Sequence, residues 1–112
     1  MVVTVYERYY VADAEFSGVR RNGALVKLIS DSEAGSITYI AEVTFFPHAD
    51  EEDYAVSYDA CFEKELFSGK GRRSRKKEAA YLEQLVETID QLAEEHGASV
   101  RWDEPLTQER RG

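Results

Sequence analysis

The chain has 112 residues, of which 43% are hydrophobic and 12% aromatic, and this is enough for one folded domain with a single core. Its apolar runs are only a few residues long, so we expect no membrane-spanning segment, and its first residues lack the features of a secretory signal. The single cysteine, Cys61, excludes an internal disulfide and indicates a reducing, cytoplasmic setting.

Charge is distributed unevenly along the chain. Lys and Arg number 14 against 22 Asp and Glu, and this net charge of −8 argues against a nucleic-acid partner for the chain as a whole. Residues 69–77, called the basic turn below, nevertheless contain no acid. The cations of the basic turn are Lys70, Arg72, Arg73, Arg75, Lys76 and Lys77. The sequence therefore has two poles of opposite charge.

The N-terminal part has the composition of β-strands. Residues 2–11 are rich in β-branched and aromatic side chains and predict a first strand. Ser17-Gly18 and Asn22-Gly23 indicate a connection, with Asn-Gly the stronger turn signal. Residues 24–30 then predict a second strand, and residues 31–36 predict the loop of a hairpin.

Apolar and polar residues alternate most clearly in the middle of the chain. Residues 37–46 predict a third strand, which Pro47 ends because proline cannot donate to a strand ladder. Residues 48–53 are expected to form an acidic hairpin tip. In residues 54–63 every second side chain is aromatic or aliphatic, which predicts a fourth strand that is buried on one side.

The hydrophobic period changes after the basic turn. Apolar residues then recur at steps of three and four, which predicts one amphipathic helix from Ser74 to His96. The residues of this stripe are Leu82, Leu85, Val86, Ile89, Leu92 and Ala93. Ser74 is the expected N-cap, and Gly97 is the expected left-handed residue after the helix.

These elements predict an α+β fold. An antiparallel sheet of about four strands packs on one long C-terminal helix in two layers, and residues 98–102 are available for a short final strand. The domain is expected to comprise residues 1–104, followed by a flexible tail of residues 105–112.

The basic turn is unusual for a helix start. Helix N-termini favour acidic side chains, because the helix dipole places partial positive charge there and leaves backbone N–H groups unpaired. Here Arg75, Lys76 and Lys77 occupy the first turn, and Arg72 and Arg73 precede it. An anion bound at this point would make the arrangement favourable, since N–H groups, dipole and side chains would all face it.

This stretch resembles part of a known family, the double-stranded RNA-binding domains. Gly69, Gly71 and Ser74, followed by Lys76-Lys77-Glu78-Ala79-Ala80, are similar to the junction between the third strand and second helix of that family. Phe46-Pro47-His48 is similar to its loop that enters the RNA minor groove. The resemblance covers about residues 37–92 and lacks the family's first helix. It implies that Lys76 and Lys77 contact phosphates, that Arg72, Arg73 and Arg75 extend the patch, and that His48 faces the groove.

Other interpretations remain open at this stage. The basic turn is also compatible with a solvated helix start that nearby acids neutralise. The acidic loops at residues 31–33 and 48–53 predict an alternative function, binding of a basic protein partner. The residues of the second loop are Asp50, Glu51, Glu52 and Asp53. A third alternative is a homo-oligomer in which the two poles of neighbouring copies meet.

We find little indication of catalysis. Cys61 has no histidine linked to it in sequence, and Lys64 is its nearest cation, so an activated thiol is not indicated. His96 is expected to interact with the dipole at the end of the helix. No metal-binding spacing, phosphate-binding loop or nucleophile motif is present. The sequence therefore predicts a non-enzymatic binding module without a cofactor or metal, and favours RNA over DNA as its nucleic acid.

Overall fold

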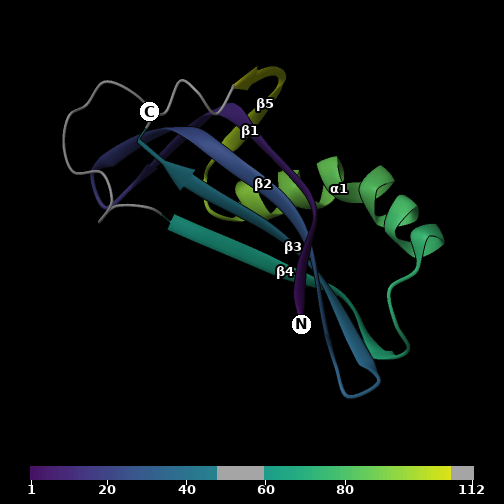
Figure 1. Ribbon diagram of the computed structural model, residues 1–112. Helices are drawn as coiled ribbons and strands as arrows, with labels where there is room; N and C mark the ends of the chain where they lie inside the picture. Colours follow the sequence, from purple (N-terminus) through teal and green to yellow (C-terminus); the bar gives the residue numbers. More distant parts are fainter. Residues whose placement is uncertain (48–59, 107–112) are drawn as a thin grey trace.

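Five antiparallel strands form one sheet in the order β4-β3-β2-β1-β5, and one helix covers a face of it (Figure 1). The computed structural model describes residues 1–47 and 60–106. The elements are β1 (Val2–Phe16), β2 (Val19–Glu33), β3 (Ser36–Phe46), β4 (Ala60–Lys70), α1 (Arg75–Glu95) and β5 (Ser99–Leu106). The predicted α+β class is confirmed, with the short final strand as the fifth strand of the sheet.

The first hairpin differs from the expectation. Its turn is Ser17-Gly18, with φ values of 53° and 77°, whereas Asn22-Gly23 lies inside β2. A two-residue turn with both residues in the left-handed region matches the twist of the strands that it joins. Gly23 has another role: a Cβ there would lie 2.5 Å from Cε1 of Phe46. The Asn-Gly pair therefore marks a point where an aromatic ring crosses the strand.

The second hairpin is also longer than predicted. β2 and β3 stay paired as far as Glu33 and Ser36, so that only Ala34 and Gly35 form the turn. The predicted loop of residues 31–36 is mostly strand. β4 is described from Ala60 and continues to Lys70, well past the predicted end at residue 63, while residues 54–59 lie outside the described residues.

The helix agrees with the prediction in its ends and differs on one flank. Ser74 is the N-cap, and Gly97 follows the helix with a φ of 73°. Leu82 and Val86, which were expected in the buried stripe, are 37% and 45% exposed. They lie at the edge of the face centred on Leu85 and Ile89, where the sheet no longer covers them.

The core lies between α1 and the sheet. Buried residues of the helix share one core cluster with Leu28, Val43 and Phe45 and with four small side chains of the sheet, Ala12, Ala14, Ala24 and Ala41. Ala24 and Ala41 lie on β2 and β3, two strands that α1 contacts, and their single methyl groups let the helix approach the sheet closely.

The last strand is a sheet edge. β5 pairs with β1, and its final residues Pro105 and Leu106 lie opposite Tyr10 and Tyr9. Proline is tolerated there because an edge strand leaves one side of its backbone unpaired. The strand thus extends two residues beyond the expected domain end at 104; residues 107–112 are outside the described residues.

Candidate nucleic-acid interface

The basic turn leaves the sheet beside the β2–β3 turn. Lys70, the last residue of β4, is paired with Ser36, and the Gly71 N–H donates to the carbonyl oxygen of Gly35 at 2.9 Å. Gly71 has a φ of 130°, a conformation that a residue with a side chain rarely adopts. This glycine therefore lets the chain turn from β4 toward the helix.

Ser74 begins α1 as an N-cap. Its Oγ accepts a hydrogen bond of 3.2 Å from the N–H of Lys77, and its carbonyl oxygen accepts one of 2.9 Å from the N–H of Glu78. The Ser74 N–H itself donates to the hydroxyl of Tyr39 on β3 at 3.2 Å. The helix start is thus attached to the sheet through a tyrosine side chain.

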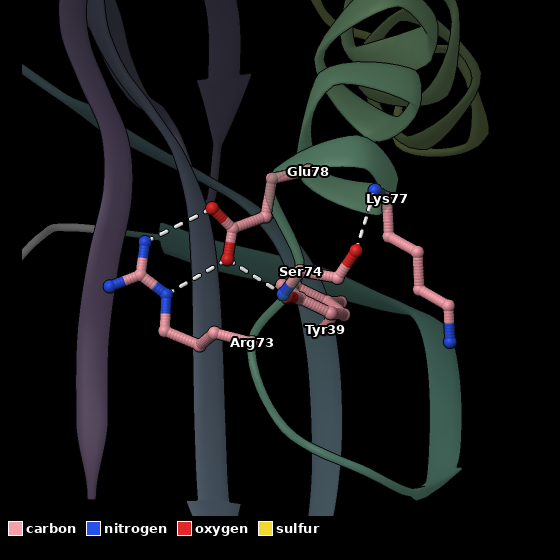
Figure 2. Close-up of polar contacts among 5 residues, drawn as sticks. All are labelled: Tyr39, Arg73, Ser74, Lys77 and Glu78. Carbon is pink, nitrogen blue, oxygen red and sulfur yellow. Dashed lines mark hydrogen bonds and ion pairs between the residues drawn. The ribbon is translucent and has the colours of Figure 1, made fainter.

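Glu78 lies at the centre of this attachment (Figure 2). Arg73 donates to both carboxylate oxygens of Glu78, from Nε to Oε2 at 2.8 Å and from Nη2 to Oε1 at 3.0 Å. The Tyr39 hydroxyl also donates to Oε2, at 2.8 Å. The side chain of Glu78 is only 9% exposed, whereas that of Arg73 is 46% exposed. Figure 2 shows Arg73 and Tyr39 converging on the carboxylate while the Lys77 side chain points away from it.

These contacts keep Glu78 ionised. The hydrogen bonds from Arg73 lower the pKa of Glu78 below its ordinary value of 4.5; burial acts in the opposite direction, and the Tyr39 hydroxyl adds to the lowering. Burial is the main cause that raises the pKa of Tyr39, so its hydroxyl stays protonated and able to donate. One cation of the basic turn, Arg73, is therefore held in an ion pair with Glu78, the residue that follows the turn.

Lys77 is held differently. Its Nζ lies 4.2 Å from the centroid of the Phe67 ring on β4, a cation–π contact. Phe67 is directed to this side of the sheet by its pairing with Tyr39. Lys77 thus covers an aromatic ring and keeps its charge at the surface.

The remaining four cations face solvent. Lys70, Arg72, Arg75 and Lys76 are exposed and form no ion pair within the described part of the chain, although the charge of Arg75 adds to the lowering of the pKa of Glu78. The backbone N–H groups of Arg75 and Lys76, at the first two positions of the helix, also have no partner among these residues. Cationic side chains and unpaired N–H groups at a helix start are the features that bind phosphate in proteins.

Phe46 and Pro47, from the other part of the family resemblance, lie at the far end of β3 from the basic turn. His48, Asp50, Glu51, Glu52 and Asp53 are outside the described residues. Pro47 directly follows Phe46 at one end of β3, whereas Ser36 at the other end pairs with Lys70 of the basic turn. At about 3.3 Å per residue, these ends are about 30 Å apart along the strand. The structure therefore does not bring Pro47 to the basic turn.

Asp31 and Glu33, which were expected in a loop but form the end of β2, are at the same end of the sheet as the basic turn. Glu33 is paired with Ser36, next to the turn that hydrogen-bonds to Gly71. Asp31 lies 3.7 Å from the N-terminal amine of Met1. No ion pair joins Asp31 or Glu33 to the basic turn in the described segments, so these acids are near the cations without being paired to them.

Sequence reasoning missed the role of Tyr39. The alternation along residues 37–46 puts Tyr39 on one face with Ile37 and Ala41, and in the structure this face is buried and Tyr39 is 0% exposed, but the alternation gives no partner for its hydroxyl. A buried tyrosine hydroxyl usually finds a hydrogen-bond partner, and Glu78 is the sole acid between Gly69 and Leu82. Together, these two facts could have predicted the hydrogen bond between Tyr39 and Glu78.

Neither the comparisons nor the described residues identify a reaction. The sequence matches no protein-family model, and no curated protein or solved structure matches it significantly.

Within residues 1–47 and 60–106, no group of three or more His, Cys, Asp and Glu side chains is placed to hold a metal ion. Helix α1 is not long and apolar enough to cross a membrane. Burial, foremost, and a hydrogen bond to Glu42 raise the pKa of Cys61, which disfavours the reactive thiolate.

Proposed function

We propose that this protein is a small non-enzymatic binding module that contacts the phosphates of a nucleic acid through the basic turn, with RNA favoured over DNA. One observation carries the proposal. Lys70, Arg72, Arg75 and Lys76 are exposed and form no ion pair among the described residues, while Glu78, the acid that follows the turn in sequence, faces inward and is paired with Arg73. The preference for RNA comes from the family resemblance of this stretch.

The proposed contact uses general electrostatics. A phosphate at the start of α1 would accept hydrogen bonds from the N–H groups of Arg75 and Lys76, and the helix dipole would add to the attraction. Lys70 and Arg72 would contact neighbouring phosphates of the same backbone. Each neutralised phosphate releases bound counterions, so the affinity is expected to fall steeply with salt.

The test is titration of a labelled nucleic acid followed by fluorescence anisotropy. Duplex RNA, single-stranded RNA and duplex DNA are compared from about 50 mM salt upward, where phosphate contacts are strongest. The double variant Arg75→Gln, Lys76→Gln is expected to bind about tenfold more weakly and to lower the slope of log K against log salt by about 2.

The matched control is Arg20→Gln, Lys64→Gln. These two exposed cations lie on β2 and β4, outside the basic turn, and their loss changes the net charge by the same amount. We expect binding by this variant to remain close to wild type. Equal losses in both variants would indicate a non-specific charge effect, and absence of binding to all three nucleic acids at low salt would overturn the proposal.

A second candidate function is binding of a basic protein partner. The observation in its favour is a row of charges on the face of the sheet turned away from α1. Glu7, Lys27, Glu42 and Glu63 are successive neighbours across four strands, so that Glu42 and Glu63 are directly opposite each other. Like charges at such positions destabilise a sheet, and a cationic partner would relieve the repulsion.

An oligolysine peptide distinguishes this candidate from the first. Binding that weakens in Glu63→Gln and is unchanged in Glu87→Gln, a variant of an exposed acid on α1, would support the acidic surface. Binding that is the same in both variants would count against it. Asp31 and Glu33, at the end of β2, are tested in the same assay with the double variant Asp31→Asn, Glu33→Gln.

A further inference from the structure

The hydrogen-bond network beneath the basic turn divides its cations into two groups. Arg73 points inward to Glu78, and Lys77 lies over Phe67, whereas the other four cations face solvent. The division is not visible in the order of residues, since Arg72 and Arg73 are adjacent and chemically identical. It follows from one buried carboxylate, one buried hydroxyl and their contacts (Figure 2).

From this geometry we infer that Tyr39 and Glu78 are positioning residues, which hold the basic turn in the conformation that presents Lys70, Arg72, Arg75 and Lys76 to phosphate. The inference rests on the proposed function. Neither residue is expected to touch the nucleic acid, because Tyr39 is 0% exposed and Glu78 is 7% exposed.

The physical basis is the cost of ordering a chain segment on binding. Residues between Gly71 and Ser74 form neither strand nor helix, and the described contacts that hold them are few. Ser74 N–H is bound to Tyr39, Arg73 is bound to Glu78 through two parallel hydrogen bonds, and Gly71 is bound to Gly35. A turn that is already ordered loses less conformational entropy when it binds a ligand, so its affinity is higher.

Variants of unchanged net charge isolate this effect. Tyr39→Phe removes the hydroxyl that Glu78 and Ser74 share. Arg73→Lys keeps a positive charge but cannot form the two parallel bonds. Both are expected to bind nucleic acid about threefold more weakly, with the salt slope unchanged because the same phosphates are contacted. The matched control is Tyr6→Phe, which removes the hydroxyl contact of Tyr6 with Tyr10 and is expected to bind as wild type does.

Glu78→Gln distinguishes positioning from simple electrostatics by the sign of its effect. Removing a negative charge from beside a phosphate site would by itself tighten binding. Loss of the ion pair with Arg73 would instead loosen the turn and weaken binding. We expect weaker binding, by about threefold, and binding as tight as wild type or tighter would overturn the inference.

Hydrogen exchange of the protein without nucleic acid separates this inference from the proposed function. The amide of Ser74 is expected to exchange faster in Tyr39→Phe and in Arg73→Lys than in wild type, whereas Tyr6→Phe leaves it unchanged. Unchanged exchange in the first two variants overturns the positioning role whether or not the wild type binds nucleic acid. Faster exchange without any nucleic-acid binding would leave Tyr39 and Glu78 as holders of the turn and would overturn both their role toward phosphate and the proposed function.

Discussion

Arg73 and Glu78 are joined by two parallel hydrogen bonds, of 2.8 and 3.0 Å, at the start of a helix whose first turn is otherwise cationic. Ion pairs of this geometry are stronger and more directional than single contacts. Because the carboxylate is buried and the guanidinium is nearly half exposed, the pair has one end in the core and one end in solvent. The same ion pair therefore stabilises the fold and fixes the conformation of the basic turn.

Replacement of Glu78 is expected to make stability less dependent on pH. The pKa of Glu78 is lowered in the folded protein, so this residue stabilises the fold above its unfolded pKa and loses the contribution as pH falls through the folded value. Glu78→Gln should cost about 1–3 kcal/mol at neutral pH, less than for a fully buried pair because Arg73 is partly solvated. Urea unfolding of both proteins at several pH values measures this. The difference should shrink below pH 4.5, and a constant difference would contradict the assignment.

Replacement of Ser30, unlike that of Glu78, is not expected to destabilise the protein. It is 1% exposed, and its hydroxyl has no hydrogen-bond partner within the described residues. Burial of an unsatisfied hydroxyl costs free energy, so Ser30→Ala is expected to leave stability unchanged or raise it by up to about 1 kcal/mol. Thermal and urea unfolding test this, with Ser68→Ala, which removes an exposed hydroxyl contact with Thr38, as the comparison. A clear loss of stability in Ser30→Ala would show that its hydroxyl has a partner.

Cys61 is expected to react slowly with alkylating reagents although it is exposed. Partial burial is the largest cause that raises the pKa of Cys61 above its ordinary value of 9.0; a hydrogen bond with Thr44 acts in the opposite direction, and one of 3.3 Å to Oε2 of Glu42 adds to the increase. The rate of alkylation by iodoacetamide should therefore rise with pH, with the midpoint of the rise above pH 9.0. Glu42→Gln should move this midpoint to a lower pH. Glu87→Gln, on the helix, is the control. A midpoint below 9.0 would contradict this prediction.

Trp102 connects β5 to α1 and serves as an internal reporter. Its Nε1–H donates to Oδ1 of Asp90 at 2.8 Å, and its ring packs against Tyr10 at a centroid distance of 4.9 Å. Asp90→Ala is expected to destabilise the protein by about 1 kcal/mol, because the indole N–H loses a charged acceptor. It should also change the emission of Trp102, the one tryptophan of the chain. Glu87→Ala is the control; equal stability of the two variants would argue against the hydrogen bond.

The class of fold could be predicted because it depends on periodicity. Alternation along residues 37–46 and the helical repeat from Leu82 to Ala93 are local properties, and they placed a helix on one face of a sheet. Strand boundaries depend on distant partners. Asn22-Gly23 is a turn signal, yet Phe46 of another strand lies over this glycine. Residues Asp103–Leu106 have no strand pattern of their own, and β5 extends to Leu106 because Pro105 and Leu106 pair with β1 beyond a register irregularity.

The sequence indicated where the candidate site lies, but it did not indicate which cations of the basic turn are paired and which face solvent. The charge run and the N-cap Ser74 are visible in the sequence, and the structure retains both. Arg73 was grouped with its neighbours because nothing nearby in sequence distinguishes it from Arg72. The distinction comes from Tyr39, which lies 39 residues before Glu78 and reaches it only through the packing of α1 on β3.

Two alanines in the core have a consequence for how substitutions can change the candidate interface. Ala24 and Ala41, on β2 and β3, are fully buried in the core that α1 covers, and a larger side chain at either position would push the helix away from the sheet locally. The helix is held at its first turn by Tyr39 and at its other end by the stack of His96 on Phe62, with ring centroids 3.8 Å apart. A larger residue beneath the helix would therefore bend it or displace one of these two contacts. The direction in which the cations face could thus be altered by substitutions that never meet the ligand.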